Sequence, residues 1–261
     1  MLKMIKPFAI IRKTDKVKMN PFVRITGGNM DERMNILDIN IDKITAKEAM
    51  KRFVSFMKTE PLKVIELVTV NSLMQMEDAL EVKQSVSSFE MVLPTDVTIL
   101  KSAGVTDKKL LQDTQDGVFL KMLFRYLHKN HKRVYLLVDT EEEGKAFFEY
   151  LERHYKGIQI GGMAKVAEED RADDMIVNAI NGADIDCVLS CMSSPLQEDF
   201  IFKNRNLLNT RIWLGMGKES PMKRRTGVMY SHFAQFIMKK IFQKEVEKRK
   251  RDLAEPVSAI K

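Results

Sequence analysis

The segment from Val64 to Asp96 constrains the fold most, because it holds two short apolar runs separated by about one helix's worth of residues. Residues 64–70 and 89–93 are rich in β-branched and other apolar side chains. This order is typical of a strand, a crossover helix and a parallel strand. Parallel strands end at the same edge of their sheet, and open α/β sheets bind ligands at that edge.

Polar residues follow both predicted strands. Thr69, Asn71 and Ser72 come after the first, and Thr95 and Asp96 come after the second. We interpret these five residues as candidate site residues, because they come from two strands that end at one edge. Ordinary turns and helix caps are the alternative, since the same residue types serve there in any fold.

The rest of the chain continues the alternation of strands and helices. Further strands are predicted near residues 34–41, 133–138, 157–160, 186–190 and 211–215, with helical patterns between them, the first opened by a capping box at Thr45 and Glu48. We therefore expect an α/β protein with a single Rossmann-like domain over residues 34–217, whose mainly parallel sheet is flanked by helices. A basic N-terminal arm (1–33) precedes it, and a basic helical appendage (218–261) follows.

Several common enzyme signatures are missing from the sequence. No Gly-x-Gly-x-x-Gly follows the first strand, and no Gly-x4-Gly-Lys-Ser/Thr occurs, so the usual dinucleotide and P-loop motifs are excluded. Neither Gly-x-Ser-x-Gly nor His-Glu-x-x-His is present. Cys187 and Cys191 with four histidines in the whole chain make a poor metal site, so we expect free thiols, no metal and no cofactor.

The net charge of +7 is unevenly distributed. Residues 1–33 hold eight Lys or Arg against three Asp or Glu, and residues 218–251 hold eleven against three, so the stretch between them is acidic. This pattern does not favour a nucleic-acid-binding protein, and no nucleic acid is expected as a partner. It favours an acidic body with basic ends that bind an anionic surface. Without a long apolar run or a secretory signal pattern, we expect a cytoplasmic protein.

Four passages resemble the WecG/TagA/CpsF family of bacterial glycosyltransferases. They are residues 36–45, which form a strand and a capped helix start; 68–72, which match a Thr-x-Asn after a strand; 91–94, which precede an acidic residue; and 194–198, which match Ser-Pro-Lys-Gln-Glu at a helix start. The resemblance covers about residues 34–214. The order and spacing of the four passages together make the resemblance specific.

This resemblance implies an activity. Family members transfer an N-acetylmannosamine-type sugar from a UDP donor to a polyprenyl-diphosphate-linked sugar at the inner membrane surface, in cell-surface polysaccharide synthesis. By the same resemblance, Thr69 and Asn71 line the pocket, Gln197 and Glu198 face the nucleotide sugar at a helix N-terminus, and Asp116 matches the last residue of the family's Arg-Val-Thr-Gly-x-Asp.

The sequence departs from the family at the predicted base. The family's Pro-Asp-Gly reads Pro94-Thr95-Asp96 here, which places Thr95 at the aspartate position and leaves Asp96 as the nearby candidate base. Arg224 and Arg225 are candidates for stabilising the leaving diphosphate, with a solvated loop as the alternative. A catalytically inactive homologue that acts as a binding or partner protein is the alternative function.

The appendage contains an amphipathic helix near residues 229–251. Tyr230, Phe233, Ile237 and Ile241 form an apolar stripe among lysines and arginines, which is typical of a helix that docks on an anionic membrane. Packing of this stripe on its own domain is the alternative. We thus predict peripheral attachment at the inner face of the membrane, with a UDP-sugar and a lipid-linked acceptor as substrates. The sequence leaves a homo-oligomer open.

Overall fold

A six-stranded parallel sheet forms the centre of the protein. The computed structural model describes residues 33–167, 172–217 and 232–254 of the 261-residue chain. The strand order in the sheet is β4-β3-β8-β7-β5-β6, and every neighbouring pair is parallel. The strands are β3 (Lys63–Val68), β4 (Met91–Pro94), β5 (Arg133–Val138), β6 (Gln159–Lys165), β7 (Cys187–Cys191) and β8 (Ile212–Gly215).

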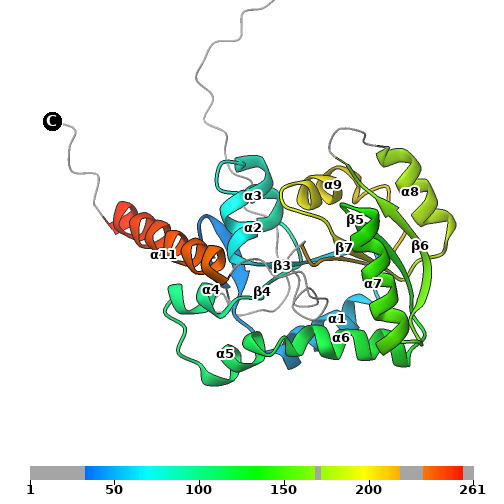
Figure 1. Ribbon diagram of the computed structural model, residues 1–261, viewed down its shortest axis with the longest axis horizontal. Helices are drawn as coiled ribbons and strands as arrows, with labels where there is room; N and C mark the ends of the chain where they lie inside the picture. The colour runs from blue at the N-terminus through cyan, green and yellow to red at the C-terminus, as the bar shows by residue number, and fades with distance from the viewer. Residues whose placement is uncertain (1–32, 168–171, 218–231, 255–261) are drawn as a thin grey trace, which may run out of the picture. The chain divides into compact units, whose positions relative to one another are not determined.

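Helices cover both faces of this sheet (Figure 1). One face packs on α1 (Ala46–Phe56), α6 (Val118–Lys129) and α7 (Glu141–His154). The other packs on α2 (Val70–Gln75), α3 (Leu80–Ser87), α8 (Asp173–Gly182), α9 (Leu196–Asn204) and α11 (His232–Ala254). Two short helices, α4 (Val97–Ser102) and α5 (Lys108–Gln115), follow β4. The predicted α/β class with a Rossmann-like parallel sheet is confirmed.

Buried apolar side chains on the two faces of the strands hold these layers together. Along β3, Val64 and Val68 belong to one apolar cluster, and Ile65 and Leu67 belong to the other. This is the period of two that a strand imposes on its side chains. A strand buried on both faces is the usual state of a parallel sheet, which explains why its sequence is continuously apolar.

Local sequence signals set the helix starts at the edge of interest. The capping box predicted for α1 is present: the Thr45 hydroxyl accepts from the Glu48 N–H, and the Glu48 carboxylate accepts from the Thr45 N–H at 2.9 Å. The Thr140 hydroxyl caps α7, whose first turn holds three glutamates, where the helix dipole favours negative charge.

The segment 34–41, which we predicted as one strand, is a hairpin instead. Strands β1 (Arg33–Ile36) and β2 (Ile39–Asp42) pair antiparallel through a two-residue turn. Leu37 and Asp38 both have positive φ, 51° and 68°, as a type I′ turn requires. Leucine rarely adopts this conformation, so no turn was expected at these residues. Burial of the Leu37 side chain, 3% exposed, compensates.

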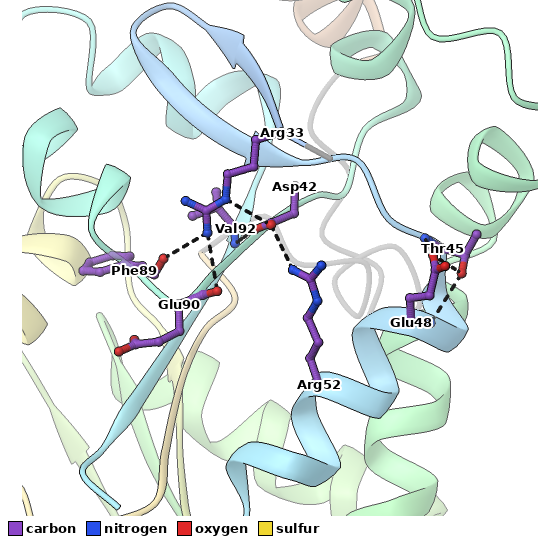
Figure 2. Close-up of polar contacts among 8 residues, drawn as sticks. All are labelled: Arg33, Asp42, Thr45, Glu48, Arg52, Phe89, Glu90 and Val92. Atoms are coloured by element: carbon purple, nitrogen blue, oxygen red, sulfur yellow. Dashed lines mark hydrogen bonds and ion pairs between the residues drawn. The ribbon is translucent and has the colours of Figure 1, made fainter. Parts of the chain in front are cut away.

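Asp42 joins this hairpin to the central sheet and to α1 (Figure 2). Its buried carboxylate accepts from the Val92 N–H at 2.8 Å, from Arg33 Nε at 3.1 Å and from Arg52 Nη1 at 3.2 Å. The guanidinium of Arg33 also donates to the carbonyl groups of Phe89 and Glu90. A buried carboxylate needs such partners, because burial without them is costly.

Other boundaries differ from the sequence-based expectation. The helix predicted over 115–129 is α6, which begins at Val118, directly after Gly117, whose φ is +59°. Strand β6 runs through Gly161 and Gly162 instead of ending there. Cys187 is buried, Cys191 is half-buried, and neither forms a disulfide. Burial raises the pKa of Cys187, and the nearby Asp186 charge raises it further. Residues 1–32 of the predicted N-terminal arm lie outside the described residues, Arg33 belongs to β1, and the predicted domain boundaries stay predictions.

Candidate active site

The carboxyl ends of β3, β8 and β7 lie next to one another, although β8 follows β3 by well over a hundred residues. In register, Glu66 of β3 pairs with Gly215 of β8, which pairs with Ser190 of β7. In the strand order, β4 and β3 lie on one side of this junction, and β8 and β7, which come later in the chain, lie on the other. Such junctions are where open α/β sheets form ligand crevices.

Thr69 and Ser72 follow β3 directly and build the start of α2. The Thr69 hydroxyl accepts from the Ser72 N–H at 3.0 Å, and the Ser72 hydroxyl accepts from the Thr69 N–H at 2.9 Å. Both hydroxyls therefore have a capping role. Asn71 is half-buried at the same helix start, and its side-chain amide has no hydrogen-bond partner among the residues that the structure describes. Of these three residues, Asn71 has the side chain best placed to bind a ligand.

Thr95 and Asp96 follow β4 at the same edge. The Thr95 N–H and hydroxyl both donate to the Val68 carbonyl, at 2.9 and 3.1 Å, which ties this turn to the end of β3. Asp96 is the N-cap of α4, and its carboxylate accepts from the Thr98 N–H at 2.8 Å. The cap that we weighed as an alternative is thus present, and it leaves the other carboxylate oxygen for a second partner.

That second partner is Lys239 of α11, whose Nζ lies 2.9 Å from Asp96 Oδ2. Burial raises the pKa of Asp96, but the Thr98 N–H and the Lys239 ammonium outweigh it, so the pKa lies below its usual value. The Asp96 side chain is 14% exposed and therefore still reaches solvent. An ionised carboxylate at the carboxyl edge of the sheet is the group that a general base requires.

An apolar cavity of about 40 Å³ opens beside Thr95. Leu67, Leu93 and Pro94 line it from the sheet, and residues of α1, α5 and α6 line the remainder. Asp113 brings a buried carboxylate to its wall, where it accepts from the Ala46 N–H at 3.2 Å and from Lys109 Nζ. The cavity is large enough for a small chemical group, so it extends the carboxyl edge of the sheet inward beside Thr95.

Asp116, the candidate taken from the family motif, is exposed at the C-terminus of α5 and accepts from Gln112 Nε2 at 2.8 Å. Asp113, one turn earlier, lines the cavity instead. Arg224 and Arg225 lie outside the described residues. A direct role for these three predicted residues stays a prediction.

Gln197 and Glu198 begin α9 and are fully buried, each with an exposed fraction of 0%. The Gln197 Oε1 atom accepts from the Ser190 hydroxyl at 2.8 Å and from the Gly217 N–H at 3.2 Å. Its Nε2 atom donates to Glu66 Oε1 at 2.5 Å. Gln197 therefore joins β3, β7, α9 and the segment after β8 below the edge of the sheet.

Glu66 and Glu198 are buried carboxyl groups in this network. The Ser194 hydroxyl donates to Glu198 Oε1 at 2.6 Å, and the Oε2 atom of each glutamate has no hydrogen-bond partner among the residues that the structure describes. Burial raises the pKa of Glu66 well above its usual value, and the charge of Glu198 raises it further, against the opposing bond from Gln197. Burial also raises the pKa of Glu198 to about 7. Both carboxyl groups therefore keep their protons to higher pH than a solvated glutamate does.

Sequence reasoning missed Glu66, Asp113 and Lys239. Glu66 lies within an apolar run, and a lone charge in a predicted buried strand was the available signal. Asp113 and Lys239 gave no such signal, because acids and lysines on amphipathic helices are ordinarily solvated. Within the three described ranges, no group of three or more His, Cys, Asp or Glu side chains could hold a metal ion.

Comparison with known proteins agrees with this architecture. A model of the family "Glycosyl transferase WecG/TagA/CpsF family" matches residues 34–219, which include the sheet and the candidate site. The chain therefore belongs to the WecG/TagA/CpsF family of glycosyltransferases, and the resemblance seen in the sequence is confirmed.

Two curated relatives are both N-acetylglucosaminyldiphosphoundecaprenol N-acetyl-beta-D-mannosaminyltransferases. The protein from Bacillus subtilis (strain 168) is 24% identical over 131 residues, which is 50% of this chain and 50% of the relative. The protein from Staphylococcus aureus (strain MRSA252) is 22% identical over 191 residues, or 71% of this chain and 73% of the relative. The chain thus spans about half the length of the Bacillus relative in the matched region.

Proposed function

We propose that the protein transfers an N-acetylmannosamine-like sugar from a UDP-sugar to a polyprenyl-diphosphate-linked sugar. The observation that carries this proposal is the ionised carboxylate of Asp96, which lies beside Thr95 and its cavity at the carboxyl edge of the sheet, within the region that the family model matches. The names of both relatives supply the substrate class, a diphospholipid-linked N-acetylglucosamine.

In this mechanism, a hydroxyl oxygen of the acceptor sugar attacks the anomeric carbon of the donor. The bond from that carbon to the UDP oxygen breaks, and UDP leaves with the electron pair. Asp96 takes the proton of the attacking hydroxyl as general base. Asn71 and the α2 start bind the donor from the neighbouring strand end, and Arg224 and Arg225 are assigned to the negative charge that develops on the departing diphosphate.

We assign Gln197 and Glu198 to support of this edge from below. Gln197 fixes the Gly217 N–H, the last described group before the segment that holds both arginines. A side chain with three hydrogen bonds in a buried site has one orientation, so it sets where that segment leaves the sheet. Contact of these two side chains with the nucleotide sugar stays a prediction of the sequence.

We further propose that α11 attaches the protein to an anionic membrane surface. Its inner face is packed on the domain through Phe242 and Val246, 0% and 4% exposed. Its outer face leaves Phe236, Ile237 and Ile241 exposed by 56%, 41% and 48%, beside exposed lysines. Of the predicted stripe, Tyr230 lies outside the described residues, and the Phe233 side chain is likewise not described. Within the described residues, no helix is both long and apolar enough to span a membrane.

Vesicle co-sedimentation tests the membrane proposal. Ile237→Asn with Ile241→Asn removes apolar side chains from the outer face of α11 and is expected to weaken binding to anionic vesicles. Binding of the wild type should also fall as the salt concentration rises, because each basic residue near the membrane surface contributes about 1 kcal/mol. Leu80→Asn with Met175→Asn, at exposed positions on other helices, is the matched control. Equal binding by both double variants would contradict attachment through α11.

A catalytically inactive partner protein is the second candidate function. The observation that favours it is that both oxygens of Asp96 are engaged, by the Thr98 N–H and by Lys239, and that its pKa is lowered, which weakens a base.

Turnover of a UDP-sugar with a lipid-linked acceptor separates the two functions. Asp96→Asn keeps an N-cap side chain but removes the base, so we expect transfer to fall about 10²–10⁴-fold. Asp107→Asn is the matched control, because Asp107 caps α5 through a 2.9 Å bond from the Leu110 N–H. Retention of more than about a tenth of the rate in Asp96→Asn would exclude Asp96 as the base. No transfer by the wild type with any acceptor would favour the inactive function.

A further inference from the structure

The inner face of α11 contacts the domain through charged side chains as well as apolar ones. Arg249 pairs with Asp38 of the hairpin turn, and Lys250 Nζ donates to the Ser102 carbonyl at 2.6 Å. Lys239, near the other end of the described helix, pairs with Asp96. Figure 1 shows α11 beside α4, the helix that Asp96 caps. The C-terminal appendage therefore places the Lys239 ammonium in an ion pair with Asp96, the candidate base.

The two members of this ion pair differ in their access to solvent. The Lys239 side chain is 39% exposed, and that of Asp96 is 14% exposed. An anion that approaches from solvent meets the ammonium before the carboxylate. Lys240, the next residue, lies over the Phe236 ring on the outer face, with Nζ 5.8 Å from its centroid.

We propose that Lys239 binds the diphosphate of the acceptor. Before the acceptor binds, Lys239 pairs with Asp96, and the diphosphate then replaces the Asp96 carboxylate as the partner of Lys239. Binding of the acceptor then frees the Asp96 carboxylate to act as base when a hydroxyl is present to be deprotonated. This inference rests on the proposed function, and it deepens that function by coupling acceptor binding to release of the base.

Electrostatics favours the exchange. A diphosphate carries more negative charge than one carboxylate and offers more acceptor oxygens to the three donors of an ammonium. Asp96 keeps the Thr98 N–H bond when Lys239 moves away, so its position at the helix cap is retained. Among the described residues, Lys239 is the charged side chain that acts on the pKa of Asp96, so its departure raises that pKa toward a better value for a base.

A four-protein binding experiment tests the competition without any turnover. The affinity of the full-length protein for a water-soluble, short-chain prenyl-diphosphate N-acetylglucosamine is measured calorimetrically, without membranes and at fixed ionic strength. Lys239→Gln is expected to bind about tenfold more weakly, the usual effect of one lost charge-assisted contact. Asp96→Asn is expected to bind severalfold more tightly, because it leaves Lys239 unpaired. The double variant should match Lys239→Gln.

Control variants separate binding from folding. Lys240→Gln removes an equal charge one residue away and should leave the affinity within about twofold of the wild type, whereas Lys239→Arg should restore most of it. The melting temperature of each variant is measured in parallel. A merely structural ion pair would lower the melting temperature in both single variants and leave both affinities unchanged.

The outcomes are distinct. Unchanged affinity in Lys239→Gln, absence of tighter binding in Asp96→Asn, or no binding by the wild type overturns the proposal. If the affinities change as expected but no UDP-sugar is turned over, the diphosphate site stands and the transferase function fails. If transfer occurs and the affinities do not change, the transferase function stands and this inference fails.

Discussion

Glu198→Gln should reveal the buried carboxyl pair through the pH dependence of folding. Glu198 has an exposed fraction of 0%, and one of its carboxylate oxygens has no hydrogen-bond partner within the described part of the chain. Its pKa is raised from 4.5 to about 7 in the folded protein. A raised pKa means that the folded state holds the proton more tightly than the unfolded state. The resulting stability is fully present below pH 4.5 and is lost as pH rises through 7.

The size of the effect follows from the same shift. Each pKa unit corresponds to about 1.4 kcal/mol, and most of this shift takes effect between pH 5 and pH 8.5. The wild type should therefore lose roughly 2–3 kcal/mol of its free energy of unfolding over that range because of Glu198. Glutamine has no charge to bury and can still accept from the Ser194 hydroxyl. The variant should resemble the wild type at pH 5 and exceed its stability at pH 8.5.

Urea unfolding at several pH values measures this difference. Trp213 is the single tryptophan of the chain and is fully buried, stacked on Phe200 at 5.6 Å between ring centroids, so its fluorescence reports unfolding. Glu152→Gln, on the exposed side of α7, is the matched control and should differ from the wild type by a constant amount. A difference between Glu198→Gln and the wild type that stays constant from pH 5 to 8.5 would refute the reasoning.

Three further substitutions test the surroundings of the site by urea unfolding. Asp42→Ala leaves the Val92 N–H without its acceptor and removes the carboxylate that pairs with Arg33 and Arg52, so it should cost roughly 1–3 kcal/mol. A loss below about 0.5 kcal/mol would contradict this. Gly215→Ala places a Cβ onto the Glu66 carboxylate and the Gln197 amide, so it should cost about 1–3 kcal/mol of overpacking; wild-type stability would show that the network yields easily. Thr45→Ala removes the cap of α1 and should cost about 0.5–2 kcal/mol, whereas Thr45→Ser should not.

The sequence predicted those parts of the fold that depend on near neighbours in the chain. Strands β3 and β4 follow from two apolar runs, although two helices, α2 and α3, connect them where one was predicted. The cap of α1 follows from Thr45 and Glu48 at a spacing of three. Burial on both faces of a parallel sheet makes such runs easy to detect. The class of fold was predictable for that reason.

Features that depend on distant contacts were not predictable. Leu37 and Asp38 adopt positive φ because the surrounding core buries the leucine, whereas their residue types do not indicate a turn. The division between α5 and α6 depends on one left-handed glycine at 117. Nor could the sequence show that β8 returns to lie beside β3, because neither strand carries a pairing signal.

The candidate site shows the same division. Thr69, Thr95 and Asp96 were placed at one edge by strand order alone, and the structure ties Thr95 to the end of β3. For Gln197, the residue type and helix position were predicted, but not its burial, because burial depends on a partner from β3. The Glu66 carboxylate accepts the Gln197 amide across 131 positions of sequence.

Gly215 leaves space for the hydrogen-bond network of Glu66, Ser190 and Gln197 directly below the carboxyl edge of the sheet. The residue lies between Glu66 and Ser190 in the register of the sheet, and a side chain there would occupy the space of the Glu66 and Gln197 groups. A small residue at the end of β8 thus lets a polar network cross three strands directly below the candidate site. Above it, Asp96 receives its cation from α11 rather than from the sheet. The sheet therefore supports its carboxyl edge from below through this buried hydrogen-bond network, and the appendage places the Lys239 ammonium above that edge.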